Sequence, residues 1–182
     1  GDRDGLRVAL TMRGEIAARA GERDAERYFR DALALAPEDV RTLAAYARFL
    51  RGAERGRDVD ALLRGHPGHE GLRLQRALAL RETAPAEAGV IAANLERSYA
   101  TARRLGRVPE LRDEAELLLT FRRDPQGALA LARRNFRDQR DEEDVDLLVR
   151  AAAAARQPEA LLPLRTWAAA QRLPLPTSKG VR

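Results

Sequence analysis

The two histidines of the chain lie in one short segment, His66-Pro67-Gly68-His69-Glu70, which is where the sequence comes nearest to a metal-binding motif. Imidazole nitrogens and a carboxylate are zinc ligands, but a tetrahedral site needs three or four donors within reach. Pro67 and Gly68 separate the histidines in a predicted loop, so the rings are not fixed on one helical face as in a His-Glu-x-x-His motif. We interpret the segment as a turn between helices and predict no metal site.

Carboxylates gather at Asp113, Glu114 and Glu116 and again over residues 141–144. Paired carboxylates can catalyse hydrolysis when their surroundings hold their pKa values apart. We expect no apolar pocket beside the first group, and the second group is placed to open a helix, where acids interact favourably with the dipole. Cysteine, phosphate-binding loops and the Gly-x-Ser-x-Gly motif are absent, so the sequence predicts neither an enzyme nor a cofactor.

Three pairs of adjacent arginines could follow a phosphate backbone. They are Arg103 with Arg104, Arg122 with Arg123, and Arg133 with Arg134. Acidic residues are interspersed among them and reduce the positive field, and aromatic side chains for base stacking make up only 4% of the chain. Nucleic-acid binding through these pairs is therefore the alternative function, less favoured than a protein partner.

The composition limits both the core and the compartment. The 182 residues include 33 basic and 28 acidic side chains, for a net charge of +5, and Lys179 is the only lysine. This use of Arg, Ala, Leu and Gly is typical of a GC-rich bacterial genome. No uncharged apolar run reaches the ~18 residues of a membrane helix, so we predict a soluble chain without membrane insertion. The compartment, exported or cytoplasmic, stays open.

Helical periodicity runs along almost the whole chain. Over residues 25–36 the apolar positions Ala25, Tyr28, Phe29, Ala32 and Leu33 follow the spacing of one buried helix face. Turn residues interrupt this pattern at short intervals, and no strand-like alternation competes with it. The sequence therefore predicts an all-α chain of about ten helices.

Small residues recur with a nearly constant period. The positions are Ala25, Val59, Ala93, Ala128 and Ala160, which lie 34, 34, 35 and 32 residues apart. A period of about 34 residues is typical of helix-turn-helix solenoids. The spacing therefore predicts five repeating helix pairs, each a helix A followed by a helix B.

These residues resemble the tetratricopeptide repeat (TPR) family, most clearly in the first unit. The matching positions are Leu10, Gly14 and Ala17 on helix A, Gly21 at its end, and Ala25, Phe29, Ala32 and Pro37 on helix B. The resemblance implies a right-handed α-solenoid of about five antiparallel helix pairs, a single domain over residues 1–171. The expected units are 6–37, 38–67, 68–106, 108–140 and 142–171, and residues 172–182 are expected to form an extended or disordered tail.

In the TPR family a ligand usually lies against the A helices, on the concave face. The candidate groove residues here are Glu15, Arg41, Arg48, Arg51, Arg81, Arg112, Glu116, Asp146 and Arg150, of which the arginines are the expected binding residues. The resemblance thus implies a non-catalytic scaffold or adaptor that binds a protein or peptide. Since guanidinium groups bind carboxylates in a bidentate manner, an acidic partner fits this groove best. A groove that is only a solvated charged surface is the alternative, so its occupancy, the identity of the partner and the oligomeric state stay open.

Overall fold

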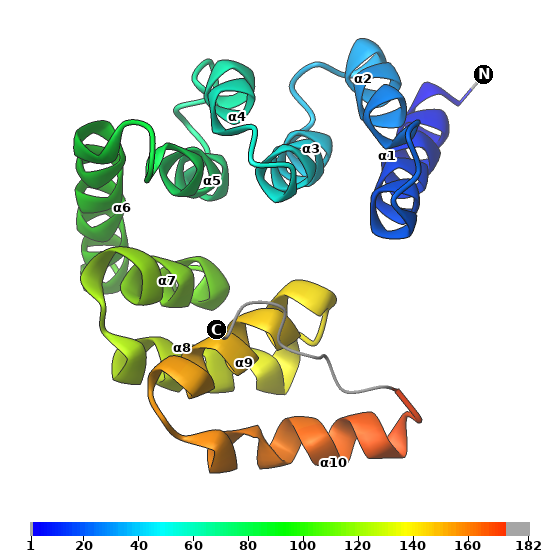
Figure 1. Ribbon diagram of the computed structural model, residues 1–182. Coiled ribbons are helices and arrows are strands. Elements are labelled where there is room, and N and C mark those ends of the chain that lie inside the picture. Colours follow the sequence, from blue (N-terminus) through cyan, green and yellow to red (C-terminus); the bar gives the residue numbers. More distant parts are fainter. Residues whose placement is uncertain (1, 174–182) are drawn as a thin grey trace. The chain divides into compact units, whose positions relative to one another are not determined.

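The computed structural model describes residues 2–173, and every regular element in that range is helical (Figure 1). The ten α-helices are α1 (Arg3–Ala20), α2 (Ala25–Leu35), α3 (Val40–Gly52), α4 (Gly56–Leu63), α5 (Glu70–Leu80), α6 (Pro85–Arg104), α7 (Leu111–Leu117), α8 (Pro125–Asp138), α9 (Glu142–Ala154) and α10 (Leu162–Ala170). A π-helical turn, η1 (Leu118–Arg122), extends α7, and a 3₁₀ turn, η2 (Pro158–Leu161), precedes α10. The prediction of an all-α chain of about ten helices is confirmed.

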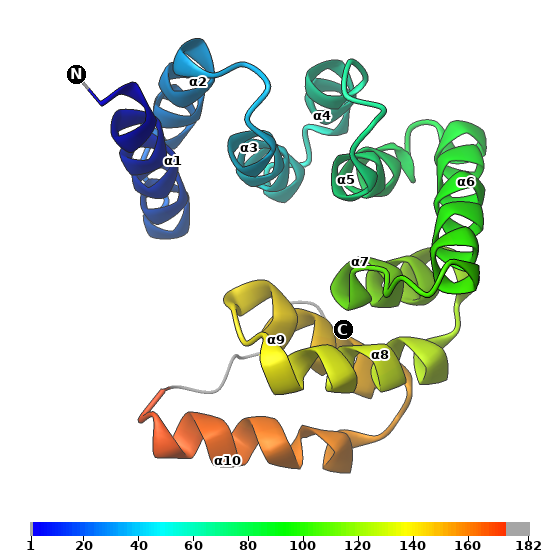
Figure 2. The same ribbon diagram turned by 180° about the vertical axis from the view of Figure 1, so that it is seen from behind.

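The chain divides into two compact units, Gly1–Leu95 and Glu96–Arg182, so the division lies within α6. In the N-terminal unit, α3 contacts α1 on one side and α5 on the other. Helix α2 packs against α1 and α3, and α4 packs against α3 and α5. In the C-terminal unit, α8 packs against α7 and α9, as Figure 2 shows from the opposite side.

Aromatic rings form the centre of the N-terminal core. Phe29 of α2 is 1% exposed, and its ring centroid lies 5.6 Å from that of Tyr46 and 5.7 Å from that of Phe49 on α3. Gly14 of α1 lies directly against the Phe29 ring, because a Cβ atom at this position would be 2.8 Å from Phe29 Cε1. Helix α1 can therefore approach α2 closely only because residue 14 has no side chain.

The helix ends follow from local sequence. Gly21 adopts φ 69° after α1, and the next amide, of Glu22, donates to the Ala17 carbonyl at 2.9 Å, which closes the last turn. Asp39 caps α3 by accepting a hydrogen bond from the Thr42 amide at 2.8 Å. Gly21 was predicted to end the first helix, and this is confirmed.

Alanine and leucine build the C-terminal core. Ala115, Ala128 and Ala152 are fully buried, and Leu148 of α9 and Leu164 of α10 are 1% and 2% exposed in the same cluster. With such small side chains at the crossings, helices can pack at the short end of the usual interaxial distances of roughly 8–10 Å. The core thus depends on close helix approach, as the composition indicates.

One expected position of the repeat is wrong. Ala93, the expected small residue of the third unit, is only half-buried, whereas Ala92 beside it is 2% exposed. Pro85 begins α6, where its missing amide proton is not needed. Helix α4 ends at Leu63, well before Pro67. The predicted tail lies outside the described residues from 174 on.

Candidate functional site

Three predicted groove arginines of the N-terminal unit, Arg41, Arg48 and Arg51, lie on α3 and contact side chains of neighbouring helices. Arg48 and Arg41 both approach Glu15 of α1, at 3.4 and 3.9 Å. Arg51 donates to the side-chain oxygen of Gln75 on α5 at 2.8 Å. Arg48 and Arg51 thus link α3 to the helices on either side of it.

The remaining groove arginines also have acceptors. Arg81 caps the C-terminus of α5 and contacts Glu82 at 3.1 Å, with both side chains largely exposed. In the C-terminal unit, Arg150 of α9 binds Asp146 on its own helix at 2.7 Å and Glu116 of α7 at 2.5 Å. The Glu116 hydrogen bond and charge raise the pKa of Arg150 although burial opposes this. Arg150 therefore remains charged and links α9 to α7.

Arg112 of α7 faces the N-terminus of α9. Its guanidinium lies 3.0 Å from Asp141 and 3.5 Å from Asp144, which together form a capping box. Asp144 is 1% exposed and also accepts a hydrogen bond from Asn135 at 2.7 Å. Burial raises the pKa of Asp144, and the prediction that this acidic run opens a helix is confirmed.

Asp113, next to Arg112, corrects one expectation. No apolar pocket was expected to separate the pKa values of these carboxylates, yet burial raises the pKa of Asp113 to about 6. The positive charge of Arg112 lowers the pKa of Asp113 but does not offset the effect of burial, and the negative charges of Glu110 and other acids raise this pKa further. A chemical role as a general acid would also need a substrate pocket beside the carboxyl, and the pocket described below has no acidic residue in its lining.

The arginine pairs that suggested nucleic-acid binding are partly engaged within the C-terminal unit. Arg103 forms an ion pair with Glu114, a buried residue of α7. Arg122 binds Glu96 through two hydrogen bonds. Arg133, of the third pair, lines the pocket described below.

The two histidines lie in the loop before α5. His66 Nδ1 is 3.0 Å from a carboxylate oxygen of Glu38, and His69 is the residue before α5. Glu70 is the first residue of that helix. Within residues 2–173 no three His, Cys, Asp or Glu side chains are grouped in a way that could hold a metal ion.

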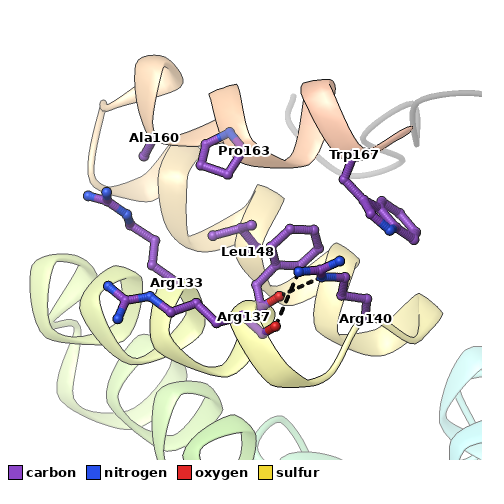
Figure 3. A pocket seen from close by; sticks show the side chains of 8 residues that line it. Arg133, Arg137, Arg140, Leu148, Ala160, Pro163 and Trp167 are labelled. Carbon is purple, nitrogen blue, oxygen red and sulfur yellow. Dashed lines mark hydrogen bonds between the residues drawn. The ribbon is translucent and has the colours of Figure 1, made fainter. Parts of the chain in front are cut away.

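A pocket of about 290 Å³ lies between α8, α9 and α10 in the C-terminal unit (Figure 3). One side of the pocket is cationic, formed by Arg133, Arg137 and Arg140, and we call these three residues the arginine rim. Arg140 donates to the carbonyls of Phe136 and Arg137 at 3.0 and 3.2 Å, and its guanidinium lies 5.4 Å from the Phe136 ring centroid. In the part of the chain that the structure describes, the side chains of Arg133 and Arg137 have no ion pair.

The rest of the pocket is apolar. Phe136 of α8 and Leu148 of α9 line this part of the pocket. The Phe136 ring packs edge to face against Trp167 of α10, with ring centroids 5.8 Å apart. Ala160 and Pro163 face the rim from the other side (Figure 3). The short η2 turn and α10 thus contribute Ala160, Pro163 and Trp167 to the lining.

Sequence reasoning did not find this pocket. Arg133 is predicted there only as part of an adjacent pair with Arg134. A recognisable signal was present, because Arg133 and Arg137 are four residues apart beside Phe136 on α8, and Arg140 follows shortly after the end of that helix. Only the packing of α10 shows that this surface is hollow.

A scan of the sequence against protein-family models gives no match, and a search among curated proteins gives none either. Within the described residues, no helix is both long enough and apolar enough to cross a membrane.

Proposed function

We propose that this chain is a TPR-like helical repeat protein, a right-handed α-solenoid of about five helix pairs that binds a partner protein or peptide without catalysing a reaction. The contacts of α3 with both α1 and α5 support this arrangement in the N-terminal unit. Glu15 bonds to Arg48, 33 residues later, and Glu116 bonds to Arg150, 34 residues later. Both separations agree with the repeat period of about 34 residues.

The partner is proposed to be acidic and to lie against the A helices. The observation that carries this proposal is that Arg41 and Arg81 keep 59% and 55% of their side chains exposed on or at the end of α3 and α5. Arg48 and Arg51 are engaged between helices, so they contribute charge and stiffness more than free hydrogen-bond donors. Exposed guanidinium groups bind carboxylates strongly and in a defined geometry.

Affinity capture with matched variants tests this function. The wild-type chain is compared, as bait in a nuclease-treated bacterial extract, with Arg41→Gln/Arg81→Gln and with a control, Arg23→Gln/Arg57→Gln. The control removes the same charge from exposed positions of the same unit, outside α3 and α5. We expect one or more proteins to be retained by wild type and control and reduced about tenfold by the groove variant.

The same experiment separates the alternatives. Equal losses in both variants would indicate a general charge effect and refute the groove assignment. Capture that is seen only in a parallel extract without nuclease, and that depends steeply on salt, would favour nucleic-acid binding. If wild type retains nothing above a bait-free resin under any salt condition, the interaction function itself is refuted.

A further inference from the structure

The strongest unassigned feature is the pocket between α8, α9 and α10, because its two halves have different chemistry. Phe136, Leu148 and Trp167 offer apolar surface, whereas Arg133 and Arg137 offer cations beside it. Arg133 and Arg137 are four residues apart on α8, so they lie on the same helix face with their Cβ atoms about 6 Å apart. A ligand that satisfies both halves must carry an apolar group and an anionic group close together.

Two of the three residues of the arginine rim, Arg133 and Arg137, have side chains available to a ligand. Arg140 is held by two main-chain carbonyls at the end of α8 and by the Phe136 ring. Arg133 and Arg137 are exposed, and no ion pair occupies their side chains in the described residues. By contrast, Arg112 and Arg150 in the same unit each contact at least two carboxylates.

The volume indicates what enters the apolar half. About 290 Å³ is just below the range of about 300–1,000 Å³ that is usual for small-molecule and cofactor sites. It is large enough for one bulky side chain but small for a whole cofactor. Segment 174–182 of the chain has Lys179 and Arg182 as its only charged side chains, so it lacks the acidic side chain that would complement the rim.

We propose that this pocket binds a linear segment of a partner protein in which a leucine or aromatic residue is flanked by Asp or Glu. The apolar side chain lies on Phe136, Leu148 and Trp167, and a flanking carboxylate binds between Arg133 and Arg137. This inference rests on the proposed role as a protein-interaction module and adds a second, chemically defined site to it. It differs from the groove on the A helices because Arg133 and Arg137 lie on α8, a B helix of the proposed repeats.

Trp167 is the only tryptophan of the chain and lines the pocket, so its fluorescence reports on occupancy at this place alone. Four short peptides are titrated into the full chain, with the cores Glu-Glu-Leu-Asp, Glu-Glu-Ala-Asp, Gln-Gln-Leu-Asn and Lys-Lys-Leu-Lys. Only the acidic peptide with leucine is expected to give a saturating change. Replacing its leucine by alanine, or its acids by amides, is expected to weaken binding about tenfold or more.

Variants locate the peptide on the rim. Arg133→Gln/Arg137→Gln should weaken binding of the acidic leucine peptide about tenfold or more. Arg134→Gln/Arg165→Gln removes two exposed arginines of α8 and α10 that do not line the pocket, and it should change the affinity less than about twofold. Far-UV circular dichroism of both variants checks that the helices are intact.

Four results would overturn the proposal. The first two are the lack of a saturating fluorescence change at about 1 mM of any acidic peptide, the upper end of useful affinity, and equal affinity for the acidic peptides with leucine and with alanine. The other two are equal losses of affinity in the two double variants, and displacement of the acidic leucine peptide by a short single-stranded oligonucleotide that binds more tightly. The last result would assign the rim to phosphate instead. If these tests fail while the groove experiment still captures a partner, only the pocket proposal is refuted. If the peptides bind and the capture experiment retains nothing through Arg41 and Arg81, the groove assignment is the part that fails.

Discussion

Replacing Gly14 by alanine should destabilise the protein, although the same change in most helices is stabilising. Gly14 lies in the interior of α1 with its Cα against the Phe29 ring. An added Cβ would lie 2.8, 2.9 and 3.0 Å from three ring atoms. The ring cannot swing aside, because Tyr46 and Phe49 pack against it and Phe29 is 1% exposed.

The magnitude follows from two opposing terms. Alanine is better than glycine in a helix interior by about 0.5–1 kcal/mol. Inserting a methyl group into a packed core costs about 1–3 kcal/mol. The Gly14→Ala variant should therefore lose up to about 2.5 kcal/mol of unfolding free energy. Gly89 of α6 is the matched control, since a Cβ there meets no atom within 4 Å. Gly89→Ala should instead gain about 0.5–1 kcal/mol.

Urea unfolding followed by circular dichroism measures both variants, and a double-mutant cycle identifies the atom pair responsible. In a Phe29→Leu background the ring edge is gone, so Gly14→Ala should become neutral or stabilising. The coupling energy between the two positions should then be about 1–3 kcal/mol. If Gly14→Ala stabilises the wild-type chain as Gly89→Ala does, α1 does not pack against Phe29 as described, and the register of the first helix pair is wrong.

Three further predictions concern the core and the titrating groups. Phe29→Ala should cost about 3–5 kcal/mol in urea unfolding, and an unchanged transition would contradict its place in the core. Hydrogen bonds from Arg55 and Tyr46 lower the pKa of Glu26 to about 2, so this carboxylate stabilises the fold above pH ~4.5 and the gain is lost as the pH falls toward 2. Glu26→Gln should therefore lose up to about 3 kcal/mol of unfolding free energy at pH 7. Between pH ~4.5 and 2 the stability of this variant should vary less than that of wild type. Burial raises the pKa of Asp113 to about 6, which has the opposite sign. The folded state binds the proton more tightly, so the contribution to stability is complete below pH ~4 and is lost as the pH rises through 6. Asp113→Asn should therefore gain up to about 3 kcal/mol of unfolding free energy at pH 7 and little at pH 4.

The helices could be predicted because their signals are local. Apolar spacing at residues 25–36 and the glycine at position 21 depend only on neighbouring residues, and α2 and the end of α1 are found where those signals place them. The small residue of the third unit was predicted one position away from the buried one. Ala92 and Ala93 are adjacent alanines, so the residue type alone does not show which of them faces the core. Only packing decides which of them is buried.

The candidate site could be predicted only in part, for a different physical reason. The sequence identifies which arginines lie on a helix face, but the carboxylates that bind them are distant along the chain. Arg48 and Glu15 are 33 residues apart, and Arg150 and Glu116 are 34 apart. A hollow surface is harder still to predict, because its lining comes from α8, α9, η2 and α10, which are brought together only by packing.

The distribution of ion pairs suggests how a chain with so many arginines can still present a specific surface. A charge that is paired within the fold contributes little to the field felt by a partner, since its counter-charge lies within a few ångströms. Arg112, Arg150 and Arg122 are paired in this way, so they hold helices together instead of attracting ligands. The net charge of +5 therefore says less about binding than the position of the arginines without an intrachain carboxylate. In the C-terminal unit Arg133 and Arg137 meet this description beside an apolar pocket, and that combination favours a ligand with both an acid and an apolar group over a uniform polyanion.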